Sequence, residues 1–127
     1  MWFKRLKRGQ IYRAVKDVPM GGLVILRAAG SGGFDCIIPK DTRLVIESDS
    51  LLFTKGAYAM PLNYKELEVK IVPKEERDFF KYKEYVLCFN FEDLPCFVKE
   101  LDGQVIKFDD DATQKRWDDS TARRGLK

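Results

Sequence analysis

The sequence predicts a mainly β domain, a small antiparallel barrel or sandwich with one short helix and a mobile C-terminal tail. Apolar residues alternate with polar ones in several short segments, as in strands that bury one face. Glycine and proline turns recur between these segments. The 127 residues are close to the usual size of one domain, and the 45% of hydrophobic residues exclude a disordered chain.

The N-terminal half contains four predicted strands, at residues 11–16, 23–28, 34–38 and 43–47. The first alternates and carries β-branched and aromatic residues. Residues 18–22 are expected to form a turn, since Pro19 cannot donate to a ladder and adjacent glycines permit turn dihedrals. The second and third strands predict a hairpin whose tip is the glycine-rich segment 30–33.

Further along, strands are predicted at residues 66–72, 85–91 and 104–108, with a short hairpin or bulged strand within 51–60. The segment 66–72 alternates most strictly. Pro73 favours one or two helical turns after it. Asp102 and Gly103 predict a hairpin turn, whereas residues 93–101 fit either a helical turn or a strand. The predicted core positions are Leu67, Val69, Ile71, Leu87, Phe89 and Ile106.

Three regions are expected along the chain: a basic arm at residues 1–8, one β-rich globular domain at 9–108 and a polar tail at 109–127. The tail has few apolar residues, so residues 111–124 predict at best an exposed, fraying helix. The opening of the domain, Gly9 to Val15 with a hairpin behind it, is similar to SH3-like barrels. Many unrelated functions share that shape, so the resemblance implies no activity.

Charge is concentrated at the N-terminus. Residues 1–16 carry six Lys or Arg and no acid. The whole chain has a net charge of +3, so residues 17–127 have a net charge of −3. Clustered cations attract phosphate or an acidic partner. The candidate contact residues for nucleic acid or an anionic partner are Lys4, Arg5, Lys7, Arg8 and Arg13. A solvated terminus is the commoner role of such an arm.

A cytoplasmic protein without a membrane span is expected. No apolar run approaches the roughly 20 residues that a membrane-spanning helix needs. The basic N-terminus leads into no apolar stretch, so it does not predict a secretory signal. Cys36, Cys88 and Cys96 are odd in number and far apart, as is typical of a reducing compartment.

The sequence lacks the side chains that most catalytic mechanisms require. The chain has no histidine, which removes the usual base for a cysteine nucleophile and a common zinc ligand. Residues 30–33 are not followed by the lysine of a phosphate loop, and residues 109–111 lack calcium-loop spacing and instead predict a helix N-cap. We expect no enzyme, cofactor or metal, although a carboxylate pair among 20 acids stays open as an alternative.

The sequence therefore predicts a non-catalytic binding module, with a protein as partner and an undetermined oligomeric state. The alternative is a nucleic-acid-binding domain that uses the basic arm and exposed strand aromatics. The residues that suggest it are Tyr82, Tyr85, Phe89 and Phe91 with Lys81 and Lys83. Acidic residues at 84, 92 and 93 flank these rings, and their negative charge would repel the phosphates of a nucleic acid.

Overall fold

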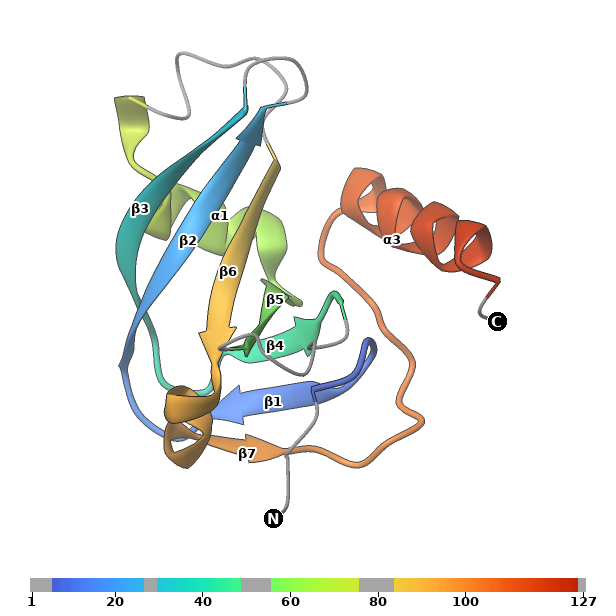
Figure 1. Ribbon diagram of the computed structural model, residues 1–127, viewed down its shortest axis with the longest axis horizontal. Coiled ribbons are helices and arrows are strands. Elements are labelled where there is room, and N and C mark those ends of the chain that lie inside the picture. The colour runs from blue at the N-terminus through green and yellow to red at the C-terminus, as the bar shows by residue number, and fades with distance from the viewer. Residues whose placement is uncertain (1–5, 27–29, 49–55, 76–83, 126–127) are drawn as a thin grey trace.

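The computed structural model describes residues 6–26, 30–48, 56–75 and 84–125. Its elements in chain order are β1 (Ile11–Ala14), β2 (Val18–Leu26), β3 (Gly30–Ile38), β4 (Arg43–Ile46), β5 (Gly56–Pro61), α1 (Tyr64–Ile71), β6 (Glu84–Asn90), the 3₁₀ helix η1 (Phe91–Cys96), β7 (Phe97–Lys99) and α3 (Asp111–Arg123). The predicted mainly β class is confirmed (Figure 1). Predictions on residues 51–55 and 76–83 lie outside the described residues.

The seven strands form one antiparallel sheet in the order β3-β2-β6-β5-β4-β1-β7. The strong curl of this sheet is visible in Figure 1, where β1 lies across and below the lower end of β6. Strands β3 and β7 are its two edges, and no ladder between described residues joins them. The predicted barrel and its SH3-like form are therefore not confirmed.

The concave side of the sheet holds an aromatic core. The ring of Phe89 in β6 lies 5.1 Å from that of Tyr12 in β1 and 4.7 Å from that of Phe97 in β7. Phe89 and Leu87 are fully buried, as the alternation of β6 predicts. These contacts join an interior strand of the sheet to the strands at its β7 edge, because β1 and β7 are three and four places from β6 in strand order.

The most strictly alternating segment is helical, so the strand predicted at 66–72 is wrong. In α1, Tyr64, Leu67 and Ile71 are buried at the spacing of one helix face, while Val69 is 58% exposed. A distant residue supplies the cap of this helix: both carboxylate oxygens of Asp109 accept hydrogen bonds from the first-turn N–H groups of Lys65 and Glu66. That capping is a tertiary contact, which local periodicity cannot reveal.

The predicted turn at 18–22 is also wrong, because β2 runs straight through it. Pro19 is tolerated since it pairs with β3 alone, and the ladder to β6 begins only at Gly21. Glycine is needed at position 22 for a different reason: a side chain there would collide with the ring of Phe34, which crosses β2 at this point. The glycine that resembles a turn signal is thus a packing position.

Two predicted hairpins differ from the structure. Residues 23–38 do form one, but Gly30 already pairs with Leu26, so the segment 30–33 belongs to β3 and not to the tip. At the second, Gly103 has the positive φ of a turn, yet residues 104–108 form no strand. The chain leaves the sheet there because Phe108 is buried against Trp117 of α3, with ring centroids 5.7 Å apart.

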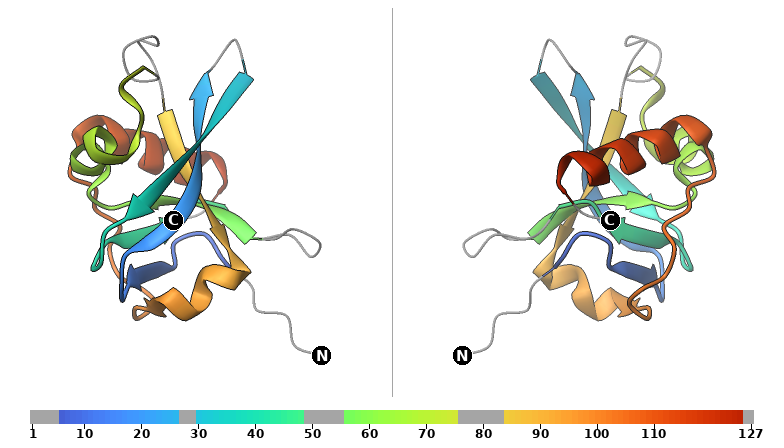
Figure 2. Two further views of the ribbon diagram at one scale, coloured as in Figure 1. Left: turned by 90° about the vertical axis from the view of Figure 1, so that its left-hand side faces the viewer. Right: turned by 90° about the vertical axis from the view of Figure 1, so that its right-hand side faces the viewer.

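The C-terminal segment is a packed helix, which corrects the prediction of an exposed helix in a mobile tail. Asp110 caps α3 by accepting from the N–H and hydroxyl groups of Thr113, as predicted for the aspartate cluster. Thr113 and Trp117 are buried. Both views of Figure 2 place the beginning of α3 beside α1. No helix within the described ranges combines the length and apolar character needed to cross a membrane.

Candidate functional site

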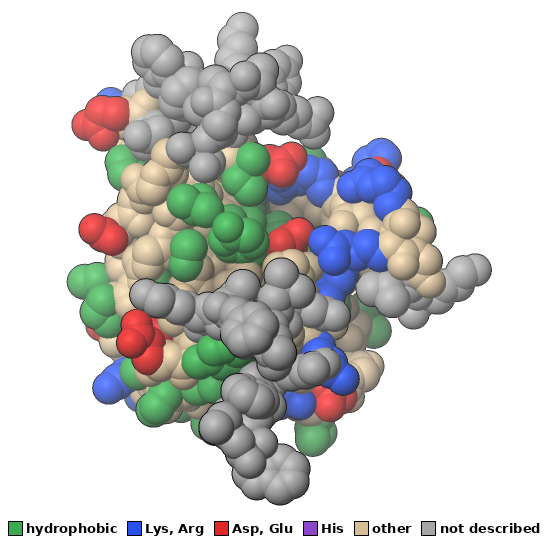
Figure 3. Space-filling model, in the orientation of Figure 1, with side chains coloured by type: hydrophobic (Ala, Val, Ile, Leu, Met, Phe, Trp, Pro, Cys, Tyr) green, Lys and Arg blue, Asp and Glu red, His purple; other side chains and the backbone are tan. Residues whose placement is uncertain are grey.

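The convex face of β2, β6 and β5 carries an exposed apolar surface, visible at the centre of Figure 3. Its side chains come from alternate positions of the three strands, and the register places them next to one another. The residues of this surface, called the apolar face below, are Leu23, Ile25, Tyr58, Val86 and Cys88. Ile25 is 37% and Tyr58 44% exposed, Leu23 and Cys88 are half-buried, and Val86 is buried. Single exposed apolar residues are common on proteins, whereas a contiguous patch indicates a binding surface.

A cleft of about 350 Å³ separates this face from α3. Ile25, Tyr58 and Val86 lie on the sheet side, and Trp117 and Arg123 lie on the helix side. The basic side chains of α3 border the apolar face on the right in Figure 3. The cleft therefore combines an apolar floor with a charged margin, the composition usual for the centre and rim of a protein interface.

Arg8 holds α3 in place beside the sheet. Its guanidinium lies 3.7 Å from the ring centroid of Trp117, and it donates hydrogen bonds to the carbonyl oxygen of Glu47 at 2.6 Å and to Thr121 Oγ1 at 3.0 Å. A cation stacked on indole and bonded to backbone carbonyls is stabilising on both counts. Arg8, predicted as part of a free basic arm, is thus a structural residue.

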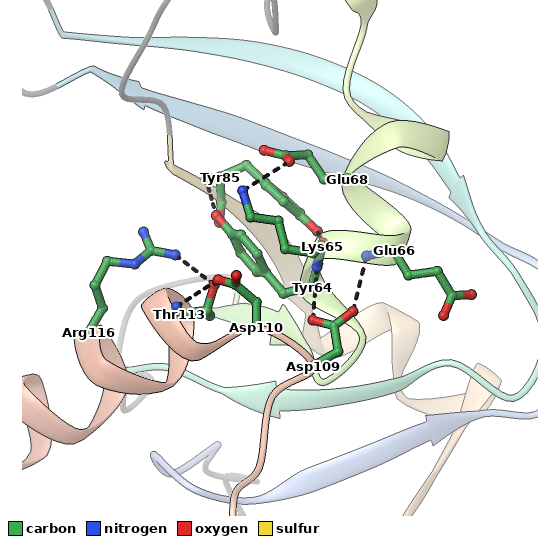
Figure 4. Close-up of polar contacts among 9 residues, drawn as sticks. All are labelled: Tyr64, Lys65, Glu66, Glu68, Tyr85, Asp109, Asp110, Thr113 and Arg116. Carbon is green, nitrogen blue, oxygen red and sulfur yellow. Dashed lines mark hydrogen bonds and ion pairs between the residues drawn. The ribbon is translucent and has the colours of Figure 1, made fainter.

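Arg116 forms the second link between α3 and the body of the protein. It lies 2.8 Å from a carboxylate oxygen of Glu84 and 5.3 Å above the ring of Tyr64 (its surroundings are drawn in Figure 4). Burial disfavours its charge, but hydrogen bonding to Tyr64 and Glu84 outweighs burial and raises the pKa of Arg116. The guanidinium is therefore committed to this contact and stays charged at all accessible pH values.

Arg123 is different, because it is exposed at the cleft and its side chain makes no hydrogen bond or ion pair with any described residue. Sequence reasoning did not single out Arg123, Arg116 or Trp117. The available signal was the spacing of Thr113 and Trp117, which share a face of one helix. The sparse apolar content of the tail concealed that signal.

The other predicted contact residues do not gather at this cleft. Arg13 lies 3.3 Å from Asp41, with both side chains largely exposed, and Lys7 is exposed. Lys4 and Arg5 lie outside the described residues. Tyr85 and Phe89 are buried, so neither ring can stack on a base, and Tyr82, Lys81 and Lys83 are again outside the described ranges. The nucleic-acid alternative loses two of the aromatic residues on which it depended.

The thiols are poorly suited to nucleophilic attack. Cys36, Cys88 and Cys96 are free and half-buried. Burial, with the nearby charge of Asp35, raises the pKa of Cys36 to about 11, and burial raises the pKa of Cys88. A thiol with a raised pKa is protonated near neutral pH and reacts slowly.

Metal ligands do not cluster in the described ranges, where no group of three or more acidic or sulfur ligands could hold an ion. The carboxylates predicted as weak metal candidates serve as caps: Asp109 for α1 and Asp110 for α3.

Comparison of the chain with family models, with curated proteins and with solved structures finds no match in any of the three.

Proposed function

We propose that this protein is a non-catalytic interaction module that binds a partner protein on the apolar face, beside α3. The observation that carries the proposal is the contiguity of Leu23, Ile25, Val86, Cys88 and Tyr58 across three neighbouring strands, next to a cleft. Burial of such a surface by a partner is favourable by about 25 cal/mol per Å² of apolar area before the costs of association.

The cleft suggests what the partner presents. About 350 Å³ accommodates one or two large side chains, and buried aromatic or aliphatic anchors dominate the energy of protein interfaces. Arg123 at the margin favours an acidic residue next to that anchor, since its charge has no partner among described residues. The proposed ligand is a partner segment with a large apolar anchor and an adjacent carboxylate.

Selection of displayed random peptides on the folded protein tests this proposal, because such selections enrich ligands for the best binding surface. We expect the selected peptides to share an apolar anchor beside an acidic residue. Ile25→Asp should weaken their binding about tenfold or more, as at an interface hot spot. Val98→Asp is the matched control, because Val98 is a strand valine of similar exposure, 41%, on β7.

Peptides that bind Ile25→Asp as tightly as the native protein would contradict the proposal, as would a selection that enriches no peptide. A salt-sensitive interaction with short DNA or RNA that does not depend on Ile25 would instead favour the nucleic-acid alternative. Circular dichroism of each variant separates loss of binding from loss of folding.

We also propose that the protein works in a reducing compartment such as the cytoplasm. The three half-buried thiols, none in a disulfide, support this. Mass spectrometry of the protein isolated under alkylating conditions should detect three alkylated cysteines. Recovery of a disulfide-linked form would contradict the proposal.

A further inference from the structure

A second and larger cleft, of about 560 Å³, lies away from the apolar face. Three parts of the chain line it: the turn at 39–43, residues 62–70 around α1, and residues 107–109 before α3. Its volume is within the range of about 300–1,000 Å³ typical of small-molecule sites. The protein-binding proposal above does not use this cleft.

The acids of this cleft are engaged by protein groups. Both oxygens of Asp109 accept from the N–H groups of α1 at 3.0 Å, as Figure 4 shows. Asp41 faces Arg13 at 3.3 Å, and Glu66 faces Lys70 at 3.5 Å. These contacts partly offset the negative charge that would repel an anion.

Two of the cations are available. Lys40, from the turn, and Lys107, from the segment before α3, are exposed, and their side chains make no hydrogen bond or ion pair with a described residue. The backbone N–H of Lys40 donates to Asp17 Oδ1 at 2.8 Å. Arg43 is occupied, since it lies 2.6 Å from Glu100 and also donates to Gln104. Free lysines with no free arginine suit a phosphate group, which accepts point charges, better than a carboxylate bound by an arginine fork.

Neutral groups complete the cleft. Leu67 and Phe108, both buried, and Leu62 give it an apolar floor. Asn63 precedes α1 at the N-cap position, but its side chain makes no capping bond, because Asp109 caps the helix instead. The amide of Asn63 is thus left to donate or accept within the cleft.

We propose that this cleft binds a small phosphorylated compound that carries a ring. Lys40 and Lys107 neutralise the phosphate, the floor of Leu62 and Phe108 takes the ring, and Asn63 bonds a polar atom of the ring or its linker. The three parts of the cleft account for three separable chemical features of one ligand.

Calorimetric titration with AMP, adenosine and inorganic pyrophosphate tests each feature. We expect AMP to bind with a dissociation constant below about 1 mM, and adenosine and pyrophosphate each to bind at least about tenfold more weakly. The double variant Lys40→Ala/Lys107→Ala should lose about tenfold or more in AMP affinity, and Asn63→Ala should lose less. The matched control is Lys16→Ala/Lys74→Ala, which removes the same charge from exposed lysines outside the cleft.

The proposal is overturned if AMP does not bind, if pyrophosphate binds as well as AMP, or if the two double variants behave alike. Thermal melting of each variant verifies folding, and all four lysines are exposed, so no loss of structure is expected. Because Ile25 lies outside this cleft, Ile25→Asp should bind AMP normally, which keeps this test independent of the protein-binding proposal.

Discussion

The side chains of Tyr64 and Tyr85 form a reciprocal clamp between α1 and β6. Their rings stack with centroids 4.2 Å apart, and each hydroxyl group bonds the backbone of the other residue. Tyr85 donates to the carbonyl oxygen of Tyr64 at 2.7 Å, and Tyr64 Oη accepts from the N–H of Tyr85 at 2.8 Å. Burial raises the pKa of both phenols, so both remain neutral. The clamp fixes the start of α1 against the sheet.

The clamp predicts the cost of removing one hydroxyl group. Tyr85→Phe removes the buried hydrogen bond from Tyr85 to the carbonyl of Tyr64, so the free energy of unfolding should fall by about 0.5–1.5 kcal/mol. Tyr12→Phe is the control, since among the described residues the Tyr12 hydroxyl makes a single, long hydrogen bond, of 3.4 Å, to Gln10. Denaturant unfolding of the two variants measures the difference. Equal losses would show that the clamp adds no specific stability.

The contact between Arg8 and Trp117 predicts that α3 depends on the N-terminal segment. Arg8→Ala removes the stacked cation and its bonds to carbonyl oxygens, and should lower the unfolding free energy by about 2–3 kcal/mol. In this variant, the rate of backbone amide hydrogen exchange should increase more in α3 than in β6. Arg124→Ala is the control. Arg124 forms a partly exposed ion pair with Glu47 at 3.7 Å, and such pairs contribute about 0–1 kcal/mol. Unchanged exchange in α3 would contradict this role of Arg8.

The helical form of α1 predicts opposite outcomes at two neighbouring apolar positions. Leu67→Ala should cost about 2–5 kcal/mol, because Leu67 is 1% exposed. Val69→Ala should be neutral or slightly stabilising, since Val69 is exposed and alanine is the better helix former. A strand with both side chains inward would make both substitutions costly. Denaturant unfolding of the two variants distinguishes these structures.

The cap at Asp110 predicts a pH dependence of stability. Hydrogen bonds from the hydroxyl and N–H groups of Thr113 hold the pKa of Asp110 below its ordinary value. A carboxyl with a depressed folded-state pKa stabilises the fold above its unfolded pKa, about 3.9, and that contribution disappears as the pH falls through the folded value. Stability should therefore decline below about pH 4 partly through this group. Asp110→Asn keeps a cap and should show a smaller decline in unfolding free energy across that window. Parallel curves for both proteins would contradict the linkage.

Much of the sheet was predictable because alternation is a local property. The parity of Tyr85, Leu87 and Phe89 in β6 predicts the buried face correctly, and the aspartate cluster predicts the cap of α3. The same local reasoning failed at 66–72, where Leu67 and Ile71 satisfy both a two-residue and a helical spacing. Asp109, more than forty residues away, caps the helix that the structure contains.

The candidate surfaces lay beyond local reasoning. By itself the sequence determined the mainly β class, the buried parity of β6 and the absence of histidine chemistry, because each depends on composition or on neighbours along the chain. Only the tertiary structure decided that Leu23, Tyr58 and Cys88 share one face of the sheet, since that follows from the strand order β2-β6-β5. It also decided that Arg8 packs on Trp117, because a contact across more than a hundred residues is specified by the packed fold and not by local periodicity.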